Sequence, residues 1–418
     1  MKNSRLMTIF LVVFVDLLGF SLILPLLPYY AEAYGATPTI IGLLVASYAA
    51  AQLIGAPLLG RLSDRIGRKP VLLISVIGTG IGFLLLGFAD PIGHLLAGWI
   101  APQAANAFVL AVLFLSRALD GLTGGNITVA QAYITDVTDD QNRAKGLGLI
   151  GAAFGLGFII GPAVGGALSN WGYNLPAFVA AFVSFINILM IIFLLPESLS
   201  AERRSEVSGQ DRPPFTLKAL NEALKRPKVG PLLQVRFFFA LAFAIFQTIF
   251  ALYAQTIGLS SQTTGILLAY VGVLSVVTQG GLIGFLTRRF RENSLMISGL
   301  WIMAGALLAW AFTTQLWYLV VLILPMAVAG GVSNTIIQSA TTKSVTRKEV
   351  GGILGISASL EAVTRIIAPI AGGYLLQHLG VWAPGIFSAV LMAWTIILAY
   401  WRIVLPSKSE KLAKEAAR

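Results

Sequence analysis

The chain has 418 residues, of which 57% are hydrophobic and only 11% are charged, whereas a soluble domain carries about 25% charged residues. The net charge of +11 comes from Lys and Arg in short segments between apolar runs, which argues against a nucleic-acid-binding face. The chain has no cysteine, which excludes disulfides and thiol catalysis, and its two histidines make a histidine-based metal centre unexpected. The composition therefore predicts a polytopic membrane protein. We also expect that it is not an enzyme and needs no cofactor, since no metalloprotease, phosphate-loop or hydrolase motif occurs in a plausible context.

Long apolar runs indicate an all-α membrane protein with twelve transmembrane helices, because each run has about the 20 residues that cross a bilayer as a helix. The predicted spans are 6–31, 39–60, 70–89, 106–135, 143–169, 174–195, 230–256, 263–287, 294–313, 316–341, 350–377 and 383–404. Nearly all Lys and Arg residues lie in the loops on one side. Since such loops stay in the cytoplasm, we expect both termini to be cytoplasmic.

A charged, proline-containing segment, Pro196 to Gly230, separates six spans from six. We expect an N-terminal six-helix bundle and a C-terminal one, related as pseudo-symmetric halves. The predicted boundaries are 1–199 for the first bundle, 200–229 for a cytoplasmic linker, 230–405 for the second bundle and 406–418 for a cytoplasmic tail. Within the linker, Phe215 to Leu224 is expected to form a short interfacial helix. The outer segment 90–105 is expected either to lie on the membrane surface or to be a variable loop.

A dense polar segment separates the second and third spans, and we expect it to form a hairpin loop. Gly60 and Gly67 would let the two helix ends approach and turn, while Asp64 would accept hydrogen bonds from Arg65, Arg68 or the N-terminus of a neighbouring helix. This spacing of glycine, acid and arginine resembles the signature loop between helices 2 and 3 of the major facilitator superfamily. The resemblance implies a cytoplasmic gate.

Five charged residues lie deep inside the predicted spans: Asp16, Arg117, Asp120, Glu361 and Arg365. A charge at this depth costs at least a few kcal/mol and usually faces a cavity or a partner. Arg117 and Asp120 share one helix face, and Glu361 and Arg365 can neutralise each other one turn apart. Both pairs could be static salt bridges, although we favour a position in a cavity. Asp16 has no cation nearby in sequence, which suits a carboxyl that binds a proton or a cationic substrate in turn.

The fifth span is rich in glycine around a proline. Gly157, Gly161 and Gly165 form a small-residue stripe that allows close backbone contact with a neighbouring helix. Pro162 removes a backbone hydrogen bond and permits a bend. We therefore expect Gly161, Pro162 and Gly165 to act in gating.

Four segments resemble proton-coupled drug exporters of this superfamily, in particular the tetracycline/proton antiporter group: Asp16 to Phe20, Arg117 to Gly121, Ala132 to Thr138, and Gly157 to Gly166. The resemblance implies export of a small amphiphilic or hydrophobic compound in exchange for protons, by alternating access of a central cavity. It also implies proton coupling through Asp16, Arg117 and Asp120, with the proton gradient as the driving force. The expected setting is the bacterial inner membrane, where a monomer would contact lipids.

Substrate-cavity candidates combine aromatic rings, which could stack on a substrate, with polar side chains. They are Tyr48, Gln52, Phe154, Phe246, Gln247, Tyr253, Glu361 and Arg365. A proton-coupled symporter or a lipid or glycolipid flippase on the same fold stays an alternative. A non-transporting membrane receptor is disfavoured, because a sensor has no need for buried titrating groups.

Overall fold

The computed structural model describes residues 2–139, 142–199, 217–346 and 349–406. Its chain divides into two compact units. Unit 1 contains Met1–Arg212 and Ala251–Val273, and unit 2 contains Pro213–Phe250 and Leu274–Arg418. The predicted domain boundaries stay a prediction.

Every regular element in the described ranges is helical. The helices before the linker are α1 (Lys2–Ile23), α2 (Leu27–Ala33), α3 (Pro38–Ile66), α4 (Arg68–Gly87), α5 (Ala89–Ile100), α6 (Ala105–Thr123), α7 (Asn126–Val137), α8 (Arg143–Leu168) and α9 (Leu175–Leu194). The later helices are α11 (Leu217–Lys225), α12 (Val229–Thr256), α13 (Ser261–Val277), α14 (Ile283–Arg289), α15 (Glu292–Ala311), α16 (Leu316–Lys343), α17 (Val350–Leu379) and α18 (Ala383–Ala399). Two π-helical turns, Thr278–Leu282 and Tyr400–Val404, continue α13 and α18, and 3₁₀ turns cover Pro102–Ala104 and Ser169–Trp171.

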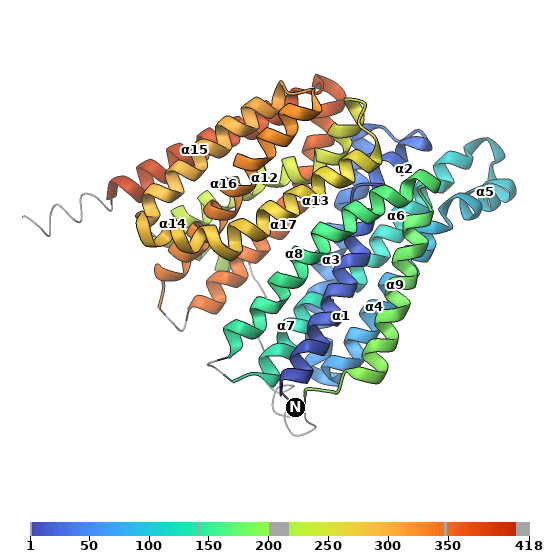
Figure 1. Cartoon of the computed structure of the whole chain (residues 1–418), viewed down its shortest axis with the longest axis horizontal. Helices are drawn as coiled ribbons and strands as arrows, with labels where there is room; N and C mark the ends of the chain where they lie inside the picture. Colours follow the sequence, from blue (N-terminus) through green and yellow to red (C-terminus); the bar gives the residue numbers. More distant parts are fainter. Residues whose placement is uncertain (1, 140–141, 200–216, 347–348, 407–418) are drawn as a thin grey trace, which may run out of the picture. The chain divides into compact units, whose positions relative to one another are not determined.

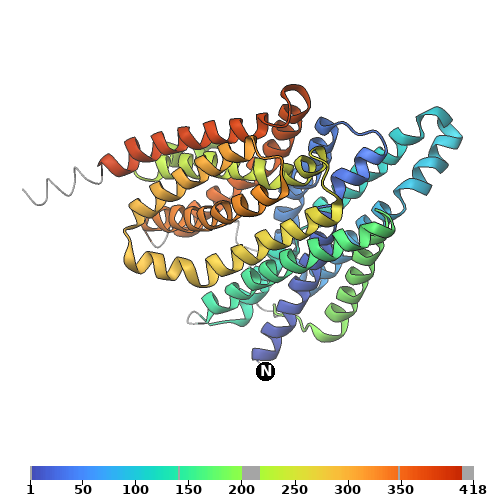
Figure 2. The same ribbon diagram turned by 45° about the horizontal axis from the view of Figure 1, so that its top comes forward.

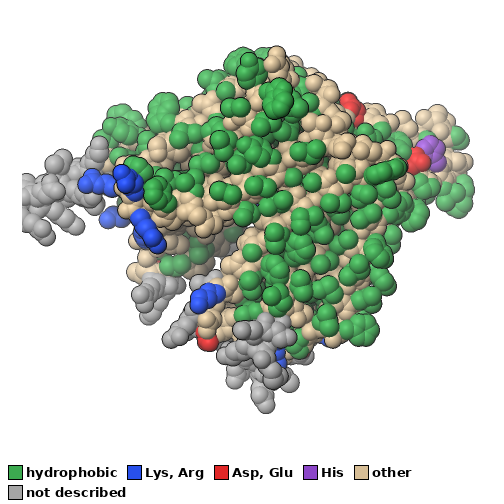
Figure 3. All heavy atoms as spheres, viewed as in Figure 1, with side chains coloured by type: hydrophobic (Ala, Val, Ile, Leu, Met, Phe, Trp, Pro, Cys, Tyr) green, Lys and Arg blue, Asp and Glu red, His purple; other side chains and the backbone are tan. Residues whose placement is uncertain are grey.

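Twelve helical segments among the described residues are long and apolar enough to cross a membrane, which confirms the predicted all-α architecture. On the visible face of each unit the side chains along the helices are mostly hydrophobic, while Lys and Arg appear near helix ends (Figure 3). Such a surface is suited to hydrocarbon, because no water is available there to solvate charged groups.

Within unit 1, helix α1 lies against α8, α9 and α7 (Figure 1). The glycine stripe of α8 faces α1, as predicted. A Cβ on Gly157 would lie 3.1 Å from Leu17 Cβ, and one on Gly165 would strike the Leu22 carbonyl oxygen. The two backbones are therefore in close contact along this stripe, and larger residues there would separate the helices.

Two spans predicted as continuous helices are interrupted. The first breaks at residues 24–26, between α1 and α2, where Pro25 cannot donate a backbone hydrogen bond. The fourth breaks at Gly124 and Gly125, between α6 and α7. A Cβ on Gly125 would lie 2.7 Å from Leu59 Cβ. Close packing against α3 therefore requires glycine at this break.

The predicted hairpin loop after the second span is shorter than expected. Helix α3 continues through Gly60 and Asp64 to Ile66, and α4 begins at Arg68. The turn consists of Gly67 alone, whose φ of 107° favours glycine. The prediction that Gly60 forms part of the turn is therefore wrong, because Gly60 has a helical conformation.

The outer segment 90–105 is not a loop but mostly helix, α5, followed by a 3₁₀ turn. With the start of α6 it forms a hairpin that extends beyond the other helices of unit 1 (Figure 2). Its tip exposes Trp99 and Ile100, which are 82% and 69% accessible. Tyr34, at the end of α2, donates a hydrogen bond of 2.8 Å to Asp90 at its base, and burial raises the pKa of the Tyr34 hydroxyl.

Unit 2 is built around α15, which packs against α16 and α18. An aromatic cluster joins α12 to α15, with the Phe246 and Trp310 rings 5.1 Å apart. Predicted linker residues 217–224 are helical within α11, whereas Phe215 and Thr216 lie outside the described residues. Helix α11 buries Ala223 against Ile353 and Ile356 of α17.

Candidate functional site

Asp16 lies in the middle of α1 and is 8% exposed. Its Oδ2 atom accepts a hydrogen bond from the Asn126 side-chain amide. Its Oδ1 atom is buried and has no hydrogen-bond partner. No cation is paired with Asp16 in the described part of the chain. A buried charge without a counter-ion is costly, so burial favours the protonated form of this carboxyl and contact with water favours the ionised form.

Asn126 reaches Asp16 because the fourth span is broken. It is the first residue of α7, directly after the Gly124–Gly125 break, so its side chain can extend toward α1. Our sequence reasoning missed this residue. Two consecutive glycines followed by asparagine, within an otherwise apolar span, were the signal that could have revealed it.

Arg117 and Asp120 form the predicted pair on α6, with Arg117 Nη1 3.2 Å from Asp120 Oδ2. Both side chains are nearly inaccessible. The guanidinium also lies over the Phe83 ring, 5.6 Å from its centre, which adds a cation–π attraction. Asp120 is close enough to Asp16 for their charges to repel. Arg117 is therefore the counter-ion of Asp120, and Asp16 is left as the unneutralised acid of this group.

A narrow space borders Asp16 and Asn126, and it is too small for a water molecule in this conformation. Its other walls are apolar side chains of α1, α4 and α7: Val12, Val13, Leu72, Val76 and Ile127. Water must enter through a conformational change before Asp16 can exchange a proton with the bulk.

The signature segment forms a buried ion-pair network inside unit 1. Arg68 lies 2.6 Å from Asp64 and 3.0 Å from Asp136, and it donates a hydrogen bond to Ser63. Arg65, by contrast, is exposed. The expected partner of Asp64 is thus confirmed for Arg68, and Asp136 is an additional partner that sequence reasoning did not identify.

Glu197 caps the N-terminus of α4, next to this ion-pair network. Its carboxylate accepts hydrogen bonds from the backbone N–H groups of Arg68 and Lys69, at 3.0 and 3.1 Å, and of Ser198. The N–H groups of Arg68 and Lys69 lie in the first turn of α4, where the helix itself offers them no acceptor. The end of the sixth span is thereby fastened to the beginning of the third.

The expected pair between Glu361 and Arg365 is wrong. Glu361 instead forms an ion pair with Arg236 of α12, and Arg236 also donates a hydrogen bond of 3.1 Å to the Asn334 carbonyl of α16. The Arg236 side chain is 7% exposed and that of Glu361 is 29% exposed. The rotation of α17 places Glu361 against α12, so the inter-helical partner replaces the partner on its own helix.

The aromatic and amide candidates for a substrate cavity fall into two groups. Tyr48, Gln52 and Phe154 are partly accessible, with Gln52 donating to the Tyr48 hydroxyl at 3.0 Å and Tyr48 lying against Phe20. Gln247 is exposed. Phe246 and Tyr253 are buried and pack as core in this conformation. Their roles in substrate binding stay predictions.

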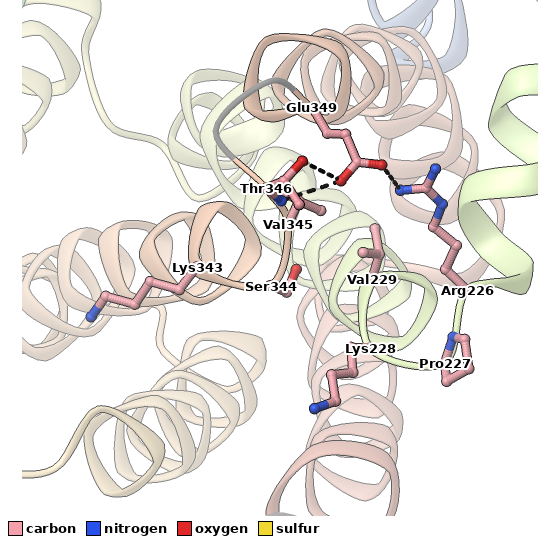
Figure 4. A pocket seen from close by; sticks show the side chains of 9 residues that line it. All are labelled: Arg226, Pro227, Lys228, Val229, Lys343, Ser344, Val345, Thr346 and Glu349. Atoms are coloured by element: carbon pink, nitrogen blue, oxygen red, sulfur yellow. Dashed lines mark hydrogen bonds and ion pairs between the residues drawn. The ribbon is translucent and has the colours of Figure 1, made fainter.

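A hollow at the α11–α12 corner of unit 2 has a volume of about 530 Å³ (Figure 4). Glu349 accepts hydrogen bonds from Thr346, and its carboxylate lies 2.8 Å from Arg226 across the hollow. The Thr346 and Arg226 hydrogen bonds lower the pKa of the Glu349 carboxyl. The Arg226–Glu349 ion pair joins the end of α11 to the start of α17. The hollow lies apart from the mid-span charges.

Comparison with known proteins gives a consistent result. A model of the Major Facilitator Superfamily matches residues 9–293 and 235–418. Tetracycline resistance protein, class C, of Escherichia coli is 29% identical over 416 residues, covering 97% of this chain and 96% of that protein. Multidrug resistance protein 2 of Bacillus subtilis (strain 168) is 26% identical over 394 residues, covering 92% of each chain. The crystal structure of a bacterial homologue of the human lysosomal transporter Spinster superposes with a TM-score of 0.71 at 15% identity, covering 96% of both chains.

Proposed function

The chain belongs to the Major Facilitator Superfamily, and on that basis we propose that it exports small amphiphilic or hydrophobic compounds in exchange for protons. The relatives named for tetracycline and multidrug resistance match nearly the whole chain and support drug export. We propose that the protein is a monomer in a bacterial inner membrane. Its termini would be cytoplasmic, since the cation-rich loops lie on one side.

One observation carries the coupling to protons: among the described residues, the buried carboxyl of Asp16 has a single hydrogen bond and no cationic partner. Ionised, it is costly in a dry span, and protonation removes that cost. When water reaches Asp16, hydration lowers the free energy of the carboxylate and the proton leaves. Opening to opposite sides of the membrane would therefore load and release one proton at Asp16.

Arg117 and Asp120 play a supporting role in this proposal. Their ion pair engages Arg117 with Asp120, so that Arg117 does not serve as the counter-ion of Asp16 when Asp16 loses its proton. Asn126 stays a donor in both states and holds Asp16 in place. The signature network of Asp64 and Arg68, with Gly161, Pro162 and Gly165 of α8, would serve the change between the two openings.

The test is tetracycline transport by proteoliposomes with an imposed pH gradient. Asp16→Asn should abolish uphill accumulation, because the amide cannot carry a proton, while tetracycline exchange without a gradient should continue. The matched control is Glu32→Gln, since Glu32 is an exposed acid at the end of the same span, and uphill transport should be unchanged. Uphill transport by the Asp16→Asn protein would contradict the proposal.

A further inference from the structure

Arg365 is a charged side chain in the middle of a membrane-spanning helix. It lies halfway along α17 (Val350–Leu379) and is exposed. Among the described residues it has no ion pair and no hydrogen bond from its side chain. An arginine cannot discharge by losing its proton, and a lasting charge at this depth almost always faces a partner or a polar cavity. In the described part of the chain, Arg365 is therefore a permanent positive charge without a partner.

The nearest acid on the same helix is not available to neutralise Arg365. Glu361 is engaged with Arg236, which lies deeper in the protein and also bonds the Asn334 carbonyl. Helices α12 and α17 therefore carry two guanidinium groups and one carboxylate within the membrane. The Arg236–Glu361 pair is neutral, and the excess positive charge is on Arg365.

The direction of Arg365 follows from the register of α17, in which residues separated by three, four or seven positions share a face. Glu361 and Gly372 stand four residues before and seven residues after Arg365, and both face α12. Glu361 pairs with Arg236, and a Cβ on Gly372 would lie 3.5 Å from Ile245 Cγ2. Arg365 is thus on the α12 side of α17.

The opposite face of α17 has the character expected of a lipid surface. Val363, Ile367 and Tyr374 are apolar and are 36%, 40% and 54% accessible. At about 100° per residue, these three positions lie roughly half a turn away from Arg365. The exposed side chain of Arg365 is therefore not on the lipid-facing side of α17.

We propose that Arg365 binds a negatively charged group of the transported compound, so that the substrates of this exporter are amphiphilic organic anions or zwitterions. This inference rests on the proposed function. A guanidinium binds carboxylate or enolate oxygens through two parallel hydrogen bonds. A purely cationic compound would be repelled by the same unneutralised charge. The Arg236–Glu361 ion pair leaves Arg365 free for the substrate, because it keeps Glu361 from pairing with Arg365.

The test compares two dyes that share a xanthene frame and have opposite charges, fluorescein and rhodamine 123. Equilibrium binding to the full-length protein in nanodiscs is measured at pH 7.5 without a proton gradient. The wild-type protein should prefer fluorescein. Arg365→Gln should weaken fluorescein binding by about tenfold or more and leave rhodamine 123 binding unchanged or tighter. Arg289→Gln, which removes an exposed arginine at the end of α14, is the matched control and should bind fluorescein as the wild type does.

Arg365→Lys keeps the charge but loses the bidentate geometry, so it should retain the preference for fluorescein at reduced affinity, even if Arg365→Gln folds poorly. A wild-type protein that prefers rhodamine 123 or binds neither dye overturns the inference, as does an Arg365→Gln protein with unchanged fluorescein affinity. Because no proton gradient is used, the result is independent of Asp16. A wild-type protein that shows no preference for fluorescein but still transports tetracycline uphill refutes this inference alone, whereas uphill transport by Asp16→Asn refutes only the coupling.

Discussion

Replacing Glu361 with glutamine removes the counter-charge of Arg236. The Arg236 side chain is 7% exposed and cannot lose its proton, so Glu361→Gln leaves an uncompensated cation inside the span. Removing one partner of a buried pair costs about 3–5 kcal/mol. We expect the lower end, about 3 kcal/mol, because Arg236 keeps its hydrogen bond to Asn334 and water can approach the 29% exposed position of Glu361.

The reverse change should cost less. Arg236→Met leaves Glu361, which is partly accessible and can reach water or take up a proton, so we expect a loss of about 1–2 kcal/mol. In the double variant neither charge remains, and its stability should exceed that of Glu361→Gln alone. The two sites touch, so their effects should be non-additive by about 1–3 kcal/mol.

The assay is reversible unfolding of the purified protein in mixed micelles, with the free energy of unfolding measured for both single variants and the double variant. Glu292→Gln is the control, since its pair with Lys343 is surface-exposed and should contribute at most about 1 kcal/mol. Equal losses in the two single variants, or strictly additive losses in the double variant, would refute the buried-pair reasoning and with it the assignment of Arg236 as the partner of Glu361.

Gly165→Ala should destabilise the folded protein by about 1–3 kcal/mol, because its new Cβ strikes the α1 backbone; Gly148→Ala, on the same helix with open space around it, should leave the melting temperature unchanged or raise it. Glu197→Ala should accelerate hydrogen exchange in the first turn of α4, since it removes acceptors from two backbone N–H groups; unchanged exchange would argue against the cap. The pKa of Glu349 is lowered from its ordinary 4.5, so its carboxylate stabilises the contact with Arg226 above that pH and loses this contribution as the pH falls through the lower folded value. The protection of α11 amides against hydrogen exchange, relative to the intrinsic rate at each pH, should therefore fall on acidification, and Glu349→Gln should remove this pH dependence.

The number and placement of the spans follow from the sequence alone, because the length of an apolar run and the distribution of cations are properties of the chain read in order. The deep charges were also visible in this way. Asp16 and Arg365 stand out because a bilayer penalises any charge, whichever helix carries it.

The breaks in the helices were less predictable. Gly124 and Gly125 lie in a span whose apolar character continues on both sides, and glycine is tolerated in transmembrane helices. Only the packing of Leu59 against Gly125 shows why the chain breaks there, and only that break brings Asn126 to Asp16.

The partners of the deep charge on α17 were decided by the tertiary structure. Sequence spacing made Arg365 the expected partner of Glu361, since residues four apart share a helix face, yet the rotation of α17 places Glu361 against Arg236 on α12. The Asp64–Arg68 pair could be expected from the sequence, but the contact of Arg68 with Asp136 on α7 depends on how the helices pack. The sequence determines which residues need a partner, because the cost of an isolated charge is local. The fold determines which partner each receives, because that depends on how the helices are rotated against one another.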